Sequence, residues 1–320
     1  MTKIQAAVNP AITTLLKAIA DKMKELNHPP LDTLTPEQSR MYYKVARGYF
    51  THTNVDKVSV SDTYFTSAEG HEIPLRIYTP EGDGPFPVLV YFHGGGWVFG
   101  DLDSSDNVCR YFARHSSTVI VSAGYRLAPE HKYPAAFHDA IESVKWTFEN
   151  VQTLNGDSDR VAVGGESSGG NLAAAASIYF REDERFLLKA QFLITPVMDY
   201  RFDTLSYREN HQYNLTNEKM IWFWSHYLSD ASQGAEVSVS PLRTPSVLGL
   251  PKTLLVTAGF DPLREEGLAF GRRLKEVGAP VSVLHFEELV HSFINMIGTV
   301  EASKEALQEM TAALREILHT

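Results

Sequence analysis

The stretch that decides the fold is Gly165-Glu166-Ser167-Ser168-Gly169. It follows a short apolar run typical of a strand, Arg160–Gly164, and precedes a run typical of a helix, Asn171–Ala176. Between a strand and a helix, a Gly-x-Ser-x-Gly pattern is typical of a tight turn that exposes the serine hydroxyl at the end of a sheet. Without that context the pattern would indicate only a glycine- and serine-rich loop. The flanking runs therefore favour Ser167 as a nucleophile.

A run of three glycines follows a second strand-like segment. Pro87–Phe92 is apolar and leads directly into His93-Gly94-Gly95-Gly96-Trp97. Consecutive glycines carry an entropic cost, and they fit a place where backbone N–H groups must approach a ligand closely. In acyl transfer, each N–H donor aimed at the developing oxyanion lowers the barrier by about 3–4 kcal/mol. We expect the N–H groups of Gly94, Gly95 and Ser168 to form such an oxyanion hole.

Two residues later in the chain complete a catalytic triad. The strand-like run Leu254–Phe260 ends at Asp261, and His291 follows the strand-like run Val281–Phe286. The interval between Asp261 and His291 is long enough for one helix and one strand. In this hypothesis His291 takes the proton of Ser167, while Asp261 orients the imidazole and stabilises the imidazolium.

Other interpretations exist for the acid. Glu287 and Glu288 precede His291 closely, but the chain would have to fold back sharply for either carboxylate to reach the imidazole. Asp261 precedes Pro262, so it also fits the start of a helix, with proline in the first turn. We therefore expect Asp261 to be the acid of the triad.

These motifs together resemble the hormone-sensitive-lipase-like esterases of bacteria, a family within the α/β-hydrolase superfamily. The resemblance extends from about the middle of the first hundred residues to the C-terminus, and it rests on His93–Trp97, Tyr125–His131, Gly165–Gly170, Glu209–Leu228, Asp261–Gly267 and His291–Phe293. It implies an α/β-hydrolase core beneath a helical cap, and hydrolysis of carboxylic esters without a metal or an organic cofactor. It also implies that Tyr125–Pro134 braces the loops of the active site.

Three positions depart from the usual pattern of that family. Glu166 stands where most members have Asp, Ser168 where most have Ala, and Ser292 where Gly is more usual. Ser168 retains the backbone N–H that the oxyanion hole needs, whereas Glu166 is one methylene longer, so its hydrogen-bond partner can differ. None of the three removes a reacting group.

Alternation of strand-like and helix-like runs predicts an α/β fold with a mostly parallel, eight-stranded sheet flanked by helices. The first two or three strands lie close together in sequence, so we expect them to be antiparallel. The strand-like runs are Val58–Phe65, Pro74–Tyr78, Val88–Phe92, Thr118–Ser122, Val161–Gly164, Ala190–Ile194, Thr253–Ala258 and Val281–Phe286.

Two segments are expected to form a helical cap over Ser167. In residues 1–50, helices are predicted from Ile12 to Met23 and from Pro36 to about Val45, the second capped by Thr35. The catalytic domain then occupies residues 51–320, and an insertion at about 199–235 interrupts its alternation of strands and helices. Within this insertion, Met220–Leu228 has the pattern of a helix with an aromatic face.

Aromatic side chains near the cap are candidates for the substrate pocket. We expect Trp222 and Phe223 to line it, although most aromatic residues of the insertion would pack it onto the core. Trp97, beside the oxyanion loop, has two equal interpretations: it lines the pocket or it packs beneath it.

Neither a metal nor a cofactor is predicted. The glycines after His93 lack the Walker lysine and the Gly-x-Gly-x-x-Gly spacing of nucleotide-binding loops. Asp101, Asp103 and Asp106 lie in a polar loop, but no bidentate glutamate and no loop glycine complete a calcium site.

Composition excludes several classes of protein. Hydrophobic residues make up 43% and charged residues 21% of the 320 residues, as in globular proteins with one large core. The net charge of −10 disfavours nucleic acids and anionic membrane surfaces as partners. A single cysteine, Cys109, rules out an internal disulfide and fits a reducing compartment.

The N-terminal region has charges dispersed among its apolar residues, and it lacks the continuous apolar run of a signal peptide. No stretch of the sequence is long and apolar enough to span a bilayer. We therefore expect a cytoplasmic protein without stable membrane association, either a monomer or a homodimer.

The function predicted from these observations is that of a serine carboxylesterase. The resemblance implies small-molecule esters with short to medium acyl chains as substrates. The same triad also fits an amidase or a lactonase. A ligand-binding receptor on this fold is a minor alternative, because related plant receptors have lost the catalytic histidine, whereas Ser167, Asp261 and His291 are all in place here.

Overall fold

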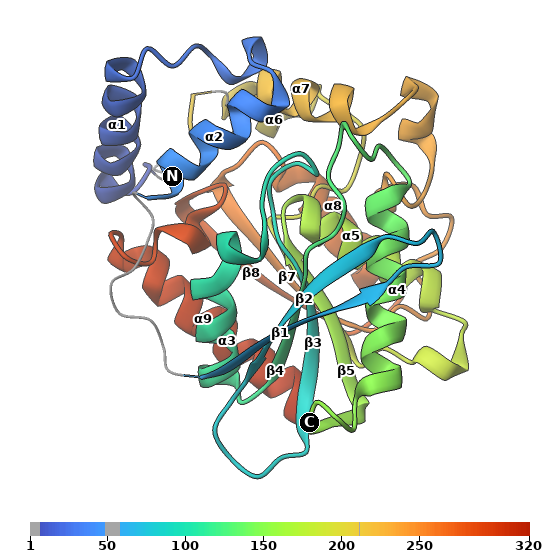
Figure 1. The fold of residues 1–320 in the computed structure, drawn as a ribbon. Coiled ribbons are helices and arrows are strands. Elements are labelled where there is room, and N and C mark those ends of the chain that lie inside the picture. Colours follow the sequence, from blue (N-terminus) through green and yellow to red (C-terminus); the bar gives the residue numbers. More distant parts are fainter. Residues whose placement is uncertain (1–6, 49–57, 211) are drawn as a thin grey trace, which may run out of the picture.

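The structure is a computed structural model, and it describes residues 7–48, 58–210 and 212–320. A single sheet of eight strands, in the order β1-β2-β4-β3-β5-β6-β7-β8, forms its centre, and helices cover both faces of the sheet (Figure 1). The strands are β1 (Ser59–Thr66), β2 (Glu72–Thr79), β3 (Phe86–Phe92), β4 (Val119–Ala123), β5 (Gly156–Glu166), β6 (Ala190–Ile194), β7 (Lys252–Phe260) and β8 (Val281–Val290).

Strand directions match the predicted fold class. β2 is antiparallel to both of its neighbours, β1 and β4, while every other neighbouring pair is parallel. The expectation of antiparallel strands near the start of the sheet is thus confirmed. All seven residues of β3 are buried, as expected for a central strand that helices cover on both sides, whereas β1 at the edge alternates between exposed and half-buried residues.

Two groups of helices enclose the sheet. α3 (Asp106–Ser116) and α9 (Glu301–His319) pack on one face, and α4 (Ala135–Asn150), α5 (Ser168–Phe180) and α8 (Arg264–Glu276) pack on the other (Figure 1). Each face therefore has its own hydrophobic core, and the largely apolar central strands contribute side chains to both.

The remaining α-helices lie together at one end of the sheet, at the top of Figure 1. They are α1 (Pro10–Glu25), α2 (Pro36–Arg47), α6 (Leu205–Glu209) and α7 (Asn217–Tyr227), and we call them the covering helices. Short 3-10 segments complete the described elements: η1 (Leu31–Thr33), η2 (Leu102–Ser105), η3 (Glu184–Phe186), η4 (Ala231–Ala235), η5 (Pro241–Arg243) and η6 (Phe293–Met296).

The covering helices begin and end close to the predicted positions. In α2 the Thr35 hydroxyl accepts from the Gln38 N–H, which confirms the predicted N-cap, and the Gln38 side chain accepts from the Thr35 N–H, which completes a capping box. In α7 the Thr216 hydroxyl accepts from the N–H of Lys219. The proposed domain boundary between residues 50 and 51 lies outside the described residues.

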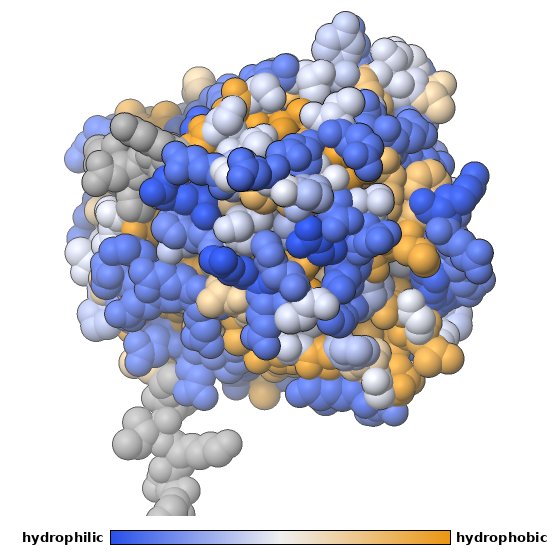
Figure 2. Space-filling model, turned by 90° about the horizontal axis from the view of Figure 1, so that it is seen from below, coloured by the Kyte–Doolittle hydropathy of each residue, from blue (hydrophilic) through white to orange (hydrophobic). Residues whose placement is uncertain are grey.

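Figure 2 shows the molecule from below, at the end of the sheet opposite the covering helices. Hydrophilic side chains cover most of that face, with apolar groups in smaller areas between them (Figure 2). Among the residues that the structure describes, no helix combines the length and the apolar character needed to cross a membrane.

Candidate active site

Ser167 occupies the turn between β5 and α5. Its backbone has φ 57° and ψ −117°, a strained conformation that side-chain-bearing residues rarely adopt. The turn is also crowded, since a Cβ on Gly169 would lie 2.0 Å from the Phe92 carbonyl oxygen and one on Gly165 would lie 2.5 Å from Gly169 itself. Glycine on both sides of the serine is therefore a steric requirement of this turn.

The structure brings Ser167, Asp261 and His291 together at the ends of β5, β7 and β8. His291 Nε2 lies 2.9 Å from Ser167 Oγ, and His291 Nδ1 lies 2.9 Å from Asp261 Oδ2. The other oxygen of Asp261 accepts the N–H of Leu263 at 2.8 Å. Asp261 is thus fixed in the turn just before α8, although the helix itself begins at Arg264.

The competing acids are elsewhere. Glu287 and Glu288 lie on β8 with exposed side chains, whereas Asp261 is buried and hydrogen-bonded to His291. The chain after β8 does not fold back to bring either glutamate to the imidazole, because the strand is extended as far as Val290.

The surroundings of His291 favour its protonated form. Burial by itself would lower the pKa of His291, but the charge and the hydrogen bond of Asp261, together with the charge of Glu166, raise this pKa above its ordinary value. A raised pKa makes the imidazole a stronger base toward the Ser167 hydroxyl, and Asp261 stabilises the imidazolium that results from the proton transfer.

His93, the first residue of the loop after β3, fixes that loop through two hydrogen bonds and a ring contact. His93 Nδ1 lies 2.8 Å from the Gly94 carbonyl oxygen, and the carbonyl oxygen of His93 accepts the hydroxyl of Tyr125 at 2.9 Å. The two rings stack with centroids 4.3 Å apart. In the part of the chain that the structure describes, the N–H groups of Gly94 and Gly95 donate to no other backbone group.

Ser168 is the first residue of α5, so its N–H has no carbonyl partner within the helix. The start of α5, which carries the Ser168 N–H, lies against the end of β3 and the start of the glycine loop, because a Cβ on Gly169 would meet the carbonyl oxygens of Phe92 and His93.

Glu166, the unusual residue before the serine, has a specific partner. It is only 5% exposed, and its carboxylate accepts the side-chain amide of Asn295 at 3.2 and 3.4 Å. Asn295 lies in η6, just after His291. The sequence analysis did not identify Asn295, because a lone asparagine in a loop carries no pattern that links it to a carboxylate so far away in the chain.

Ser167 and His291 form part of the wall of a cavity of about 560 Å³. Residues of α1, α2 and α7 supply most of the opposite wall, and Gly94, Gly95 and Gly96 border the cavity beside the serine. Two segments that are far apart in the sequence therefore enclose the same space.

Only one of the three predicted pocket aromatics reaches that wall. Phe223 lines the cavity, whereas Trp97 and Trp222 do not. Trp97 is fully buried and stacks on Tyr227 with centroids 4.3 Å apart, so it packs beneath the pocket. Trp222 packs against Phe99 at 5.7 Å. The expectation that Trp222 lines the pocket is therefore wrong, because its ring on α7 packs against Phe99. Of the two interpretations of Trp97, the structure supports packing beneath the pocket.

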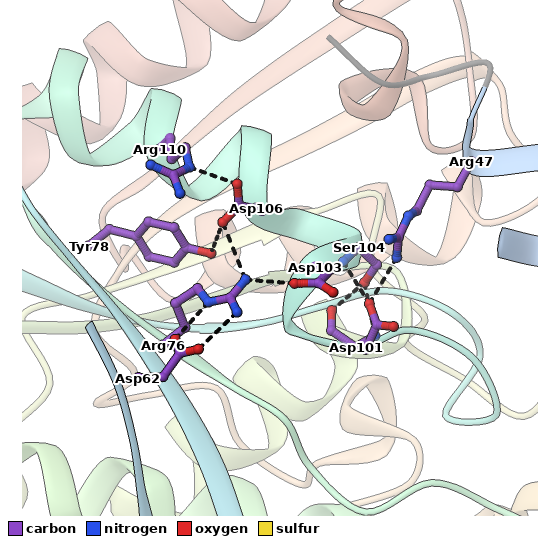
Figure 3. Close-up of polar contacts among 9 residues, drawn as sticks. All are labelled: Arg47, Asp62, Arg76, Tyr78, Asp101, Asp103, Ser104, Asp106 and Arg110. Carbon is purple, nitrogen blue, oxygen red and sulfur yellow. Dashed lines mark hydrogen bonds and ion pairs between the residues drawn. The ribbon is translucent and has the colours of Figure 1, made fainter. Parts of the chain in front are cut away.

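Arginines attach α2 to the loops around the site. Arg40 Nε donates to the Val98 carbonyl oxygen at 2.8 Å, and its Nη2 donates to the Ala128 carbonyl oxygen at 2.8 Å. At the end of the helix, Arg47 forms an ion pair with Asp101 at 2.8 Å (Figure 3). The loop that carries the three glycines is therefore fastened to α2.

The insertion after β6 contacts the triad loops from the other side. Asn210 donates to the Asp261 carbonyl oxygen at 3.4 Å, and Asn214 donates to the His291 carbonyl oxygen at 3.2 Å. The covering helices and their flanking segments thus contact both the glycine loop and the ends of β7 and β8.

A second cavity, of about 590 Å³, lies beside the first and contains a cluster of charges. Arg76 pairs with Asp62, Asp103 and Asp106, and Asp106 also accepts from Tyr78 and Arg110 (Figure 3). Asp103 and Asp106, weighed above as metal ligands, are therefore engaged with arginines that join α3 to the edge strands β1 and β2. No group of three metal-binding side chains is found among the described residues.

Comparison with protein families agrees with this geometry. A family model described as an alpha/beta hydrolase fold matches residues 89–295, a span that begins in β3 and includes Ser167, Asp261 and His291. The chain belongs to this family. Its place among the hormone-sensitive-lipase-like esterases, predicted from the motifs, is confirmed by its named relatives.

Relatives of this α/β hydrolase carry the names of ester-cleaving enzymes. The carboxylic ester hydrolase LipN of Mycobacterium tuberculosis is 38% identical over 265 residues, which cover 81% of this chain and 70% of the relative. An ethyl acetate hydrolase of Pseudomonas putida is 29% identical over 317 residues, 98% of this chain and all of the relative. The esterase of the archaeon Pyrobaculum calidifontis has a solved structure with a TM-score of 0.87, 31% identity and coverage of 97% of this chain and 99% of its own. The predicted class of enzyme, an ester hydrolase, agrees with these names.

Proposed function

We propose that this α/β hydrolase is a serine carboxylesterase that cleaves short- to medium-chain carboxylic esters through a covalent acyl-enzyme. The proposal rests above all on the hydrogen bonds that join Ser167 Oγ to His291 and His291 to Asp261. Ser167 and His291 also line the cavity, so a substrate in the cavity can reach them. A nucleophile, a base within hydrogen-bond reach and a group that orients the base are the parts that acyl transfer needs.

In the acylation step, Ser167 Oγ attacks the ester carbonyl while His291 Nε2 takes the hydroxyl proton. The carbonyl π electrons move onto the oxygen and form a tetrahedral oxyanion. When that intermediate collapses, the bond to the alcohol oxygen breaks and His291 gives its proton to the departing alkoxide. The products of this step are a free alcohol and an ester of Ser167.

Deacylation repeats the sequence with water. His291 removes a proton from water as the water oxygen attacks the acyl carbon, and the second tetrahedral intermediate then releases Ser167 with the proton returned from His291. Asp261 stays ionised in both steps and holds the Nδ1–H of the imidazole, so that Nε2 always faces the serine.

We assign the oxyanion hole to the N–H groups of Gly94, Gly95 and Ser168. The two glycine N–H groups have no backbone acceptor among the described residues, and the N–H of Ser168 lies at the start of α5. A buried oxyanion in their reach would gain hydrogen bonds that need no rearrangement of the loop, since Tyr125 and His93 already hold it.

We also infer that residues 1–50 and the insertion at about 199–235 act as a cap, which excludes water from the acyl-enzyme and limits acyl length. A cavity of about 560 Å³ accommodates a small ester, and one relative is named for ethyl acetate, a small ester. A cytoplasmic location, suggested by the single cysteine, belongs to the same proposal.

The test is hydrolysis of chromogenic acyl esters of increasing chain length by the wild type and Ser167→Ala in parallel. We expect wild-type kcat/KM to peak at short or medium chains, and we expect Ser167→Ala to lose activity while it melts at a similar temperature. Equal turnover by both proteins would contradict the assignment of Ser167. An absence of turnover by the folded wild type would contradict ester hydrolysis.

A further inference from the structure

The charged side chains on the cavity wall are unbalanced in sign. Among the described residues that line the cavity, Lys24, Arg47 and Lys219 carry positive charge, whereas Glu166 is the single carboxylate. Arg47 is paired with Asp101, and Glu166 lies next to the serine and accepts from Asn295. Lys24 is exposed on α1, so Lys219 is the enclosed cation of this wall.

Lys219 has few hydrogen-bond partners. It lies in the first turn of α7, and its ammonium donates to the Asn214 carbonyl oxygen at 2.8 Å. An ammonium has three donor hydrogens, so this contact leaves two of them for another partner. Lys219 is half-buried and is one of the residues that line the cavity, together with the apolar residues Leu215, Met220 and Phe223.

No carboxylate in the described residues forms an ion pair with Lys219. Burial lowers its pKa, and the charge of Asp32, which lies beyond ion-pair distance, only partly opposes that effect. An enclosed ammonium without a counter-ion is unfavourable, and it is stabilised when an anion enters the same space. Holding the carbonyl oxygen of Asn214 needs only one neutral donor, so that contact alone does not account for a charged side chain at this position.

Asn214 links Lys219 to His291 through two hydrogen bonds. The carbonyl oxygen of Asn214 accepts from Lys219, and the side-chain amide of the same residue donates to the His291 carbonyl oxygen at 3.2 Å. Lys219 and Ser167 also line the same cavity, so a ligand in that cavity has both residues on its walls.

We propose that Lys219 is a binding site for a carboxylate carried by the substrate, so that esters with a free carboxylate at the far end are preferred over neutral esters of the same size. This inference rests on the proposed esterase function, because it assigns the substrate class of the same cavity. The carboxylate belongs either to the acyl part, as in half-esters of dicarboxylic acids, or to the alcohol part, as in acylated hydroxy acids.

Two matched pairs of substrates distinguish these sources. Monoethyl adipate is compared with ethyl hexanoate for an anionic acyl part, and the acetate ester of γ-hydroxybutyrate is compared with butyl acetate for an anionic alcohol part. Acid release is followed by titration at constant pH, and the result is the ratio of kcat/KM for the anionic ester to kcat/KM for its neutral partner.

The variants are Lys219→Met, which removes the charge, Lys219→Arg, which keeps it, and Lys44→Met, which removes a charge from the exposed side of α2. We expect Lys219→Met to lower the ratio about tenfold or more for one of the pairs, since a hydrogen bond to a charged group is lost. Lys219→Arg should retain most of the ratio, and Lys44→Met should leave it within about twofold of wild type. A change of less than about threefold for both pairs in folded Lys219→Met would overturn the inference.

A binding measurement distinguishes a failure of the proposed anion site from a failure of the proposed esterase function. Calorimetry with Ser167→Ala measures the Kd of each of the two anionic esters without turnover, and Lys219→Met in the same background should weaken the binding of at least one of them by about tenfold or more. If the wild type cleaves neither member of a pair but this difference in Kd is present, the proposed function fails and the anion site stands. If esters are cleaved and Lys219→Met changes neither Kd, only the anion site fails.

Discussion

The ends of the strands and the covering helices enclose one cavity, but they relate to the sequence in different ways. At the ends of β5, β7 and β8, hydrogen bonds of 2.9 Å join Ser167, His291 and Asp261, and each residue lies at a position that the sequence singled out. In the covering helices, the side chains that line the cavity belong to ordinary amphipathic helices. A tight turn restricts which residues can occupy it, whereas a helix face accepts many side chains of suitable size.

The largest expected effect tests the strand ends. Asp261→Asn should lower kcat/KM by about 10⁴-fold, because the amide no longer holds the imidazole tautomer that accepts the serine proton. Steady-state hydrolysis of one short ester measures this effect. Glu288→Gln is the matched control and should stay within about twofold of wild type, because Glu288 lies exposed on β8. A larger loss in Glu288→Gln than in Asp261→Asn would show that the acid has been misassigned.

The attachment of the covering helices is tested by Arg40→Met. The substitution leaves the carbonyl oxygens of Val98 and Ala128 without the donor that binds them now, so the free energy of unfolding should fall by about 2–3 kcal/mol. Activity should fall with it, since α2 borders the cavity beside the glycine loop. Urea unfolding and ester hydrolysis measure the two effects.

Lys17→Met provides the control for that experiment. Lys17 pairs with Asp21 on the exposed side of α1, and such surface pairs contribute less than about 1 kcal/mol. An Arg40→Met protein as stable and as active as Lys17→Met would mean that α2 does not depend on this contact.

A smaller effect concerns the start of α2. Thr35→Ala removes the hydroxyl that accepts the Gln38 N–H, and it should destabilise the protein by about 1 kcal/mol. Thermal unfolding of Thr35→Ala beside Thr35→Ser, which keeps the hydroxyl, measures the contribution. Equal melting of the two variants would show that the cap adds nothing to stability.

The smallest expected effect concerns Glu166, the last residue of β5. The charge of Glu166 helps to raise the pKa of His291, and His291 must be unprotonated to accept the serine proton. In the wild type, kcat/KM should therefore fall as the pH drops through a pKa above 6.5, the ordinary value for histidine. Glu166→Gln should move this acid limb to lower pH, as measured by pH profiles of both proteins. A limb that moves to higher pH would contradict the assigned sign.

Prediction from sequence succeeded where local geometry dictates the residue type. The runs on either side of the Gly-x-Ser-x-Gly pattern indicated a strand over Arg160–Gly164 and a helix over Asn171–Ala176, and these runs lie within β5 and α5. The N-cap at Thr35 was also predicted, because its hydrogen bond joins residues three apart in the chain.

Prediction failed where contacts join distant segments. Trp222 was expected in the pocket and Trp97 was left with two interpretations, yet neither ring lines the cavity, because the packing of α7 on the glycine loop decides which side chains face it. Asn295, which binds Glu166, and Arg40, which fastens α2, were missed for the same reason. Their partners lie far away in the sequence, and nothing in either residue's local pattern identifies them.

The sequence by itself determined the sheet, its helices and the order of serine, aspartate and histidine, since these follow from periodicity and from turns that few residues can form. Only the tertiary structure decided that α1, α2 and α7 share one cavity with Ser167, and that Lys219 lines this cavity while its ammonium binds the Asn214 carbonyl oxygen. Burial and pairing of a charge depend on every segment that packs around it, and one segment's sequence does not contain that information.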